Sequence, residues 1–196
     1  NGADTKKVNY QGDVGMHVAM TLWGVQQLGF DTKTDLSAAD LGQAYAHGAT
    51  AYKAGDASTV AEIKVINKHV YERDDDTINA LYDKGREISL AYFETIYETV
   101  GTQFDAYFFE SEAGPKGREL VLQHDAIFTD SDGAKVFVGE EYGLHTRVFI
   151  NSEGLPTYEA KELALAKMKE DTLGPYDHSV VSTANEINEY FKVLLQ

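Results

Sequence analysis

The sequence contains no cysteine among its 196 residues. Disulfide frameworks and thiolate zinc sites are therefore excluded, and this usage fits a reducing compartment, so we expect a cytoplasmic protein. No apolar run approaches the roughly 20 residues that a membrane-spanning helix needs, and no charged and then apolar leader precedes the first expected strand. We therefore expect a soluble protein without a membrane partner.

Basic residues are also scarce. The chain has 17 Lys and Arg against 32 Asp and Glu, which gives a formal net charge of -15. Such a surface argues against phosphate-backbone binding by the chain as a whole, so we expect any nucleic acid to be held locally or by another part of the molecule. The hydrophobic content of 43% excludes a wholly disordered chain and is enough for one sizeable core or two small ones.

The sequence has no initiator Met at its start and no helix-stop signal at its end. The chain starts at Asn1 and ends in the apolar run Val193-Leu194-Leu195-Gln196. We therefore expect an excerpt from a longer protein.

The chain divides into three stretches that differ in their predicted secondary structure. Residues 1–36 predict a strand at 7–10, a loop, and a helix at 16–28. Residues 37–101 have helical spacing almost throughout, with a capping box at 37–40, a break at 55–56 and a second cap at 74–77. Residues 102–196 change to short strands and helices. The expected strands are 104–109, 126–129, 134–138, 146–150 and 178–182, and the expected helices are 116–123, 156–169 and 185–195.

This alternation of strands and helices predicts an α/β fold with a parallel sheet covered by helices. The turn Asp130-Ser131-Asp132-Gly133 predicts a β-hairpin within it. The same turn imitates the start of a calcium loop, but Lys135 stands where that loop needs glycine, so we expect no calcium. The six histidines form no close ligand pair, and we expect no metal site.

Two glycine-containing loops invite a functional interpretation. The loop Gly12-Asp13-Val14-Gly15 lies where a strand leads into a helix, which is the usual place for a ligand at the carboxyl edge of a parallel sheet. It lacks the third glycine of a dinucleotide fingerprint, and plain turn chemistry is the alternative. The segment Gly114-Pro115-Lys116-Gly117 is no P-loop, and we expect it to begin a helix.

The strongest candidate site lies at the start of the helix expected at 156–169. Tyr158 and Glu162 are four residues apart and share a helical face, so a hydroxyl and a carboxylate could form one wall of a pocket for a cation. Glu110 follows an apolar strand and is either a solvated terminus or a third member of this wall. The alternative is a core-edge tyrosine beside a solvated first-turn acid that the helix dipole favours.

Several segments together resemble the bacterial arginyl-tRNA synthetases. They are Val8-Asn9-Tyr10-Gln11-Gly12-Asp13-Val14-Gly15, Phe104-Asp105-Ala106-Tyr107-Phe108-Phe109-Glu110-Ser111, Ser131-Asp132-Gly133-Ala134 and Gly154-Leu155-Pro156-Thr157-Tyr158, in the order and spacing of that family. The resemblance covers nearly the whole chain. It implies a class I aminoacyl-tRNA synthetase, which activates arginine with ATP and transfers it to tRNA.

For the fold, the resemblance implies an internal fragment of a Rossmann-type catalytic domain. Residues 1–36 would be part of the catalytic core, 37–101 a helical insertion, and 102–196 the remainder of the core with its β-hairpin. The fold class is thus α/β, a partial Rossmann-type parallel sheet with a helical insertion and a small β-hairpin region.

The resemblance also implies roles for single residues in binding arginine. Tyr158 would contact the arginine side chain, Glu162 would stand at the position of a family aspartate that binds the guanidinium, and Glu110 would face the amino group or the guanidinium. The loop residues would border the arginine and adenylate pocket. Two asparagines near the C-terminus lie close to the position of a Gln/His segment that in the family faces arginine or adenosine. These further candidates are Asn9, Gly12 and Asp13 in the loop and Asn185 and Asn188 near the C-terminus.

The sequence also departs from the family pattern. Glu162 is one methylene longer than the family aspartate, and Lys161 stands where arginine is usual. The chain has neither a His-Ile-Gly-His element nor a Lys-Met-Ser-Lys-Ser loop. We therefore expect ATP and Mg²⁺ to serve the intact parent protein, tRNA to be bound through other parts, and this segment to be inactive alone and to bind no cofactor. The alternative is a non-catalytic arginine-binding or interaction module of the same fold. The sequence carries no signal for an oligomeric state.

Overall fold

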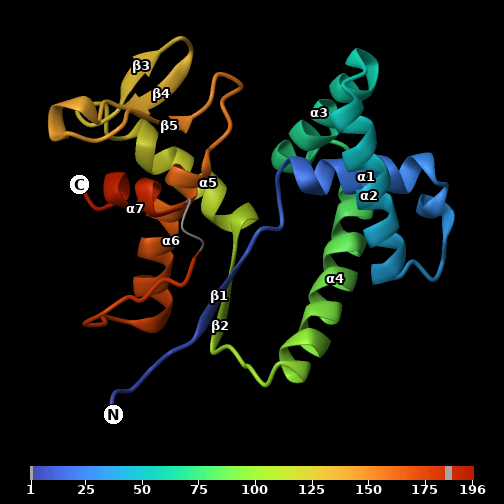
Figure 1. The fold of residues 1–196 in the computed structure, drawn as a ribbon, viewed down its shortest axis with the longest axis horizontal. Coiled ribbons are helices and arrows are strands. Elements are labelled where there is room, and N and C mark those ends of the chain that lie inside the picture. Colours follow the sequence, from blue (N-terminus) through green and yellow to red (C-terminus); the bar gives the residue numbers. More distant parts are fainter. Residues whose placement is uncertain (1, 184–186) are drawn as a thin grey trace. The chain divides into compact units, whose positions relative to one another are not determined.

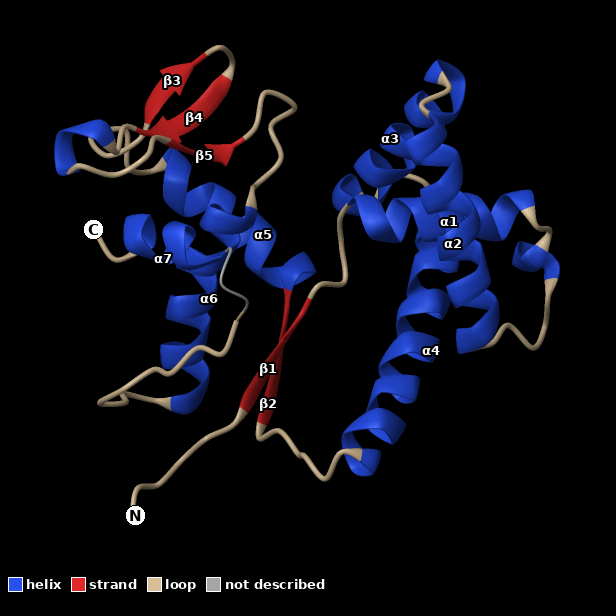
Figure 2. Cartoon of the chain, viewed as in Figure 1, coloured by secondary structure: helices blue, strands red, loops and turns tan. Residues whose placement is uncertain are grey.

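The structure of the protein is a computed structural model that describes residues 2–183 and 187–196 (Figure 1). Helices predominate, and the strands are short (Figure 2). The helices are α1 (Met16–Gln27), α2 (Ala38–Ala54), α3 (Ala57–Glu72), α4 (Asp76–Thr99), α5 (Glu110–Leu122), α6 (Tyr158–Leu173) and α7 (Asn188–Leu194), with single 3-10 turns at Phe30–Thr32 and Glu140–Tyr142. The strands are β1 (Val8–Gln11), β2 (Ala106–Phe109), β3 (Thr129–Ser131), β4 (Ala134–Phe137) and β5 (Arg147–Ile150). Across the described part of the chain, no helix combines the length and the apolarity needed to cross a bilayer.

The strands form two separate sheets. The first is the parallel pair β1 and β2, in which Val8 lies opposite Ala106 and Gln11 opposite Phe109. The second is antiparallel, in the order β3, β4, β5. The mixed α/β class is confirmed, with a parallel component of two strands and a separate antiparallel component of three.

The chain divides into two compact units. The mixed unit comprises Asn1–Gln11 and Ala106–Gln196, and the helical unit comprises Gly12–Asp105. The predicted helical insertion, 37–101, lies within the helical unit together with α1. The two compact units do not correspond to the three domains that the resemblance implies. The boundaries of those domains therefore stay a prediction.

The helical unit is held together by an apolar core in which α1 packs against α2 and α3. Ile63 and Val25 are its largest fully buried side chains. Two glycines allow α1 and α2 to touch through their backbones. A Cβ atom on Gly24 would lie 2.0 Å from the carbonyl oxygen of Ala44, and one on Gly48 would lie 2.0 Å from the carbonyl oxygen of Met20. The contact is reciprocal, so both helices need glycine at this crossing.

Helices α2 and α4 start at the two predicted caps, and α3 starts at the predicted break. The Asp40 amide donates to Ser37 Oγ at 3.2 Å, and the Ser37 amide donates to Asp40 Oδ2 at 3.0 Å, which completes the capping box. Hydrogen bonds from Lys33 and Ser37 lower the pKa of the Asp40 carboxyl to about 2. Asp56 caps α3 and Asp75 caps α4 through bonds of 2.9 Å to backbone amides. The predicted breaks between these helices are confirmed.

The mixed unit contains two smaller cores, one around Phe128 and Phe149 and one around Phe108 and Met168. The predicted hairpin turn is confirmed, because Asp132 and Gly133 both have positive φ, 48° and 79°, between β3 and β4. Such a two-residue turn matches the twist of the paired strands.

Three predicted elements of the mixed unit are wrong in place or type. The strand expected at 178–182 does not form, since residues 174–183 contain no strand and Val180 is 93% exposed. A β-branched run forms a strand only where a neighbour supplies backbone partners. The strand expected at 126–129 starts only at Thr129, because the Ile127 and Phe128 amides both donate to the His124 carbonyl in a turn.

The third error concerns helix α5, which was expected at 116–123 and begins six residues earlier, at Glu110. Pro115 lies inside the helix, so Gly114-Pro115-Lys116-Gly117 does not begin it. Proline removes one backbone donor, whereas the acids Glu110 and Glu112 suit the first turn through the helix dipole. Helices α6 and α7 form as expected with shifted bounds, although residues 185 and 186 lie outside the described part.

Candidate functional site

The start of α6 is fixed to the end of β5 by hydrogen bonds. The Thr157 amide donates to the Phe149 carbonyl at 2.9 Å, and Thr157 Oγ1 donates to the Val148 carbonyl at 2.7 Å. In the connecting loop, Asn151 Oδ1 accepts from the Glu153 and Leu155 amides at 3.0 and 2.9 Å. The strand, turn and helix predicted for this segment are confirmed, and the first residues of α6 start from a rigid base.

Helix α5 approaches the first turn of α6 closely. A Cβ atom on Gly117 would lie 2.1 Å from the Ala160 carbonyl oxygen, so only glycine fits there. From α5, Arg118 Nε also donates to the Gly154 carbonyl at 3.1 Å. The first turn of α6 is therefore buried against α5, and Glu159, Lys161 and Glu162 all lie below 10% exposure.

Tyr158 and Glu162 meet on one face of α6, as their spacing predicts. The Tyr158 hydroxyl donates a hydrogen bond to the Glu162 carboxylate. Burial, and then the nearby charge of Glu162, raise the pKa of the Tyr158 hydroxyl, so it stays a donor at neutral pH. Glu162 is only 9% exposed and is thus not the solvated acid of the alternative interpretation. The shared face is confirmed, whereas a role in ligand binding stays a prediction.

The buried carboxylate of Glu162 is electrostatically costly. Burial raises the pKa of the Glu162 carboxyl, and the negative charge of Glu110 adds to this increase. The hydrogen bond from Tyr158 and the positive charge of Lys169 lower the pKa in turn. A carboxylate in such surroundings gains from a cation placed against it, because the cation offsets the loss of hydration. The site is therefore suited to bind and orient a positively charged group.

Glu110 joins this cluster from the first residue of α5, directly after β2. Lys161 Nζ donates to Glu110 Oε2 at 2.6 Å, and the two side chains are 8% and 18% exposed. Glu110 is thus not a solvated terminus. Its charge is matched by a lysine of the protein itself, which the sequence alone did not reveal because the two residues are 51 positions apart.

Asn9 lies in β1 of the mixed unit, opposite Tyr107. Gly12 and Asp13 belong to the helical unit. There the Asp13 carboxylate accepts from Arg86 Nε at 2.8 Å and from the Tyr82 hydroxyl at 3.3 Å, and its side chain is 6% exposed. Asp13 therefore ties the loop to α4, and the predicted binding roles of all three residues stay predictions.

The structure describes only one of the two candidates near the C-terminus. Asn185 lies outside the described residues. Asn188 is the first residue of α7 and is exposed. Its predicted role in facing arginine or adenosine stays a prediction. Within the described ranges, no group of three His, Cys, Asp or Glu residues is arranged to hold a metal ion.

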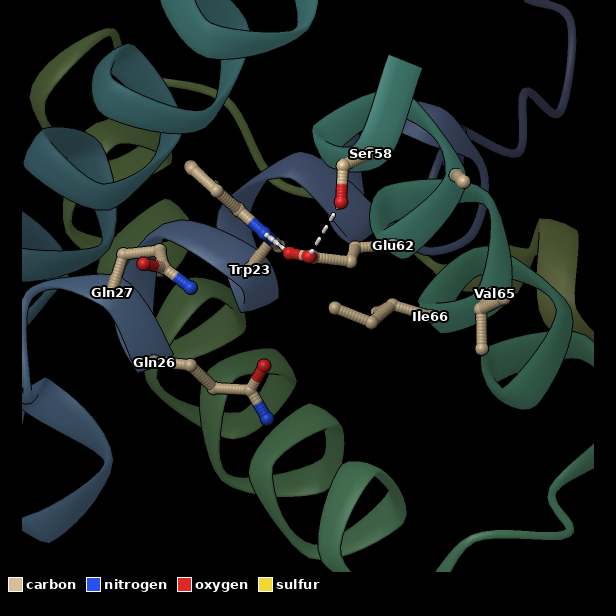
Figure 3. Close-up of a pocket in the computed structure, with 8 residues that line it drawn as sticks. Trp23, Gln26, Gln27, Ser58, Glu62, Val65 and Ile66 are labelled. Carbon is tan, nitrogen blue, oxygen red and sulfur yellow. Dashed lines mark hydrogen bonds between the residues drawn. The ribbon is translucent and has the colours of Figure 1, made fainter. Parts of the chain in front are cut away.

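The helical unit also has an open groove of about 430 Å³ between α1 and α3 (Figure 3). Its only lining carboxylate, Glu62, accepts from Trp23 Nε1 at 2.9 Å and from Ser58 Oγ at 3.4 Å. Trp23 stacks on His47 with ring centroids 5.6 Å apart. Trp23 and Glu62 thus join α1 to α3, and local sequence patterns do not indicate this contact because the two residues are 39 positions apart.

No protein-family model matches the chain. Sequence relatives are nevertheless found among the arginine–tRNA ligases. That of Encephalitozoon cuniculi (strain GB-M1) is 27% identical over 99% of the chain, and that of Treponema pallidum is 27% identical over 98%. The ligase of Clostridium acetobutylicum is 30% identical over 59% of the chain. These alignments cover 34%, 34% and 21% of the relatives, so the chain spans about a third or less of their length.

Solved structures agree with the sequence relatives in fold. The crystal structure of the arginyl-tRNA synthetase from Plasmodium falciparum superposes on 98% of the chain with a TM-score of 0.73, at 18% identity and over 32% of that protein. The resemblance inferred from the sequence motifs is thereby confirmed. Over nearly its whole length, the chain is similar in sequence and in fold to about one third of an arginyl-tRNA synthetase.

Proposed function

We propose that the chain is part of an arginine–tRNA ligase and that the cluster at the start of α6 binds the side chain of arginine. Homology to arginine–tRNA ligases supports the activity. The observation that carries the choice of site is the buried Glu162 carboxylate, which accepts a hydrogen bond from Tyr158 at the start of a rigidly anchored helix.

Glu162 is suited to a guanidinium for a chemical reason. A guanidinium is permanently charged and presents several donors in one plane, which match the two oxygens of a carboxylate. One acceptor position of Glu162 is used by the Tyr158 hydroxyl, which fixes the orientation of the carboxylate plane. An uncharged ligand would leave the buried charge unpaired, so the same residues provide selectivity.

Glu110 has a different part in this proposal. Because Lys161 is bonded to Glu110 Oε2, the Glu110 carboxylate acts mainly through its negative charge, and the guanidinium contact belongs to Glu162. Asn9 and Asn188, which belong to the same unit as Glu162, remain candidates for the borders of the pocket.

The full reaction needs groups beyond this cluster. Formation of arginyl-adenylate places new charge on the α-phosphorus and on the leaving pyrophosphate, which needs cationic and hydrogen-bond donors. We propose ATP and Mg²⁺ as the co-substrate and its metal ion, and tRNA as the acceptor, in the cytoplasm. We assign them no residues of this chain.

The substitution Glu162→Gln tests the assigned pocket. Glutamine keeps the shape and one oxygen acceptor but removes the charge, so arginine should bind about tenfold more weakly, which corresponds to about 1.4 kcal/mol. Isothermal titration calorimetry with arginine measures this change. Glu170→Gln is the matched control, because Glu170 lies on the same helix and is exposed. Equal losses in the two variants, or no loss in either, would remove Glu162 from the pocket.

A further inference from the structure

Two residues that the sequence did not single out form a stack beside Tyr158. The Arg147 guanidinium carbon lies 4.4 Å from the centroid of the Tyr190 ring. The Tyr190 ring in turn lies 6.0 Å from the Tyr158 ring, with 57° between their planes. Arg147 begins β5, Tyr190 lies in α7, and Tyr158 begins α6, so the stack joins three elements of the mixed unit.

Arg147 contributes to this stack in an unusual way. Its Nε atom is buried, and among the described residues it has no hydrogen-bond partner. A buried donor without a partner costs free energy, whereas the ring face of a tyrosine attracts a cation. The Nε atom of Arg147 therefore makes no hydrogen bond, and the guanidinium instead contacts the Tyr190 ring and holds it in place.

The Tyr190 ring in turn limits the movement of Tyr158. Tyrosine has two side-chain torsions, and a ring packed against its side restricts both. The direction of the Tyr158 hydroxyl matters because it donates to Glu162. A loss of the Tyr190 ring would leave Tyr158 free to take other rotamers and to leave the carboxylate.

We propose that Tyr190, held by Arg147, is a positioning residue that keeps the Tyr158 hydroxyl on the Glu162 carboxylate. The proposal deepens the assignment of Glu162 as the partner of the arginine guanidinium and rests on it. Neither Tyr190 nor Arg147 needs to touch the ligand. They act by fixing the carboxylate and its hydrogen-bond donor before arginine arrives, which lowers the cost of ordering them on binding.

The protonation of Glu162 gives a readout that does not depend on arginine. The groups that face its carboxyl are Tyr158 and Lys169 on α6 and Glu110 on α5, and Lys161 is paired with Glu110. The Tyr158 bond favours the charged form of Glu162, so its loss raises the pKa of the Glu162 carboxyl. Arginine binds the charged form, and the low-pH limit of arginine binding should move to higher pH together with this pKa.

The test is a carbon-13 NMR titration of the Glu162 side-chain carboxyl in the full chain, assigned with Glu162→Gln. Tyr190→Ala should raise the pKa of this carboxyl and weaken arginine binding about tenfold, the loss expected when a hydrogen bond to a charged group is broken. Tyr190→Phe keeps the ring and should restore both values. Tyr176→Ala, which removes a tyrosine that is 44% exposed, should change neither.

A second variant keeps the proposal testable if Tyr190→Ala fails to fold. Arg147→Met removes the buried unpaired donor, so the thermal midpoint should not fall, yet the pKa of the Glu162 carboxyl should still rise. An unchanged Glu162 pKa in both variants overturns the positioning role. Failure of the unaltered protein to bind arginine overturns the proposed function instead, whatever the titration shows.

Discussion

The substitution Gly48→Ala should destabilise the helical unit by about 3 kcal/mol, the upper end of the usual cost of overpacking. The added Cβ would lie 2.0 Å from the Met20 carbonyl oxygen, well inside the 3.0 Å that real Cβ atoms keep. Both sides of this contact are helix backbone, so α1 and α2 must separate. Alanine favours an isolated helix by about 1 kcal/mol, which is less than the expected cost of this overpacking, so the net effect is a loss of stability.

Trp23 is the only tryptophan of the chain and is buried in the core of the same unit, so its fluorescence during urea unfolding reports on this unit. Gly42→Ala is the control on the same helix, because a Cβ at Gly42 meets nothing within 4 Å. It should leave stability unchanged or raise it. If Gly48→Ala is as stable as Gly42→Ala, the backbone contact between the two helices does not exist as described.

The substitution Lys161→Met should destabilise the junction of α5 and α6 by about 2–3 kcal/mol. It leaves the Glu110 carboxylate, 18% exposed, without its ion-pair partner, and an uncompensated buried charge costs up to about 5 kcal/mol where water is fully excluded. Hydrogen exchange of the α5 and α6 amides measures this loss locally.

The double variant Lys161→Met with Glu110→Gln separates charge from packing. It removes the uncompensated charge, so it should recover most of the lost stability. If the double variant is as unstable as Lys161→Met alone, the lysine acts through packing or through other contacts, and the ion pair is not what holds the first turns together.

Local signals predicted much of the helical unit. Ser37 and Asp40 form the capping box that their spacing indicates, and Asp56 and Asp75 cap the following helices. These features depend on residues within four positions, so they can be read from the sequence. The crossing at Gly24 and Gly48 could not be read in this way, because it depends on which helices meet.

The same distinction applies to the site. The four-residue spacing of Tyr158 and Glu162 was enough to predict their shared face. The burial of Glu162 and the pairing of Glu110 with Lys161 depend on the packing of α5 against α6, which nearby residues do not specify. Tyr190 was missed for the same reason, since only the tertiary fold brings α7 to Tyr158.

The errors in the mixed unit occur where local propensity does not decide the structure. Val180 and Val181 have strand propensity but no strand partner, and Pro115 is tolerated inside α5. Propensity describes what a residue permits, whereas pairing and packing decide what forms.

We propose that the buried Glu162 carboxylate at the start of α6 recognises the guanidinium of arginine. A calorimetric titration of the protein with arginine and with citrulline tests it most directly, because citrulline has nearly the same shape and carries an uncharged urea group in place of the guanidinium. We predict saturable binding of arginine and at least about tenfold weaker binding of citrulline, since the latter leaves the Glu162 charge unpaired. Equal affinity for the two ligands, or no binding of arginine, would show that Glu162 does not recognise the guanidinium.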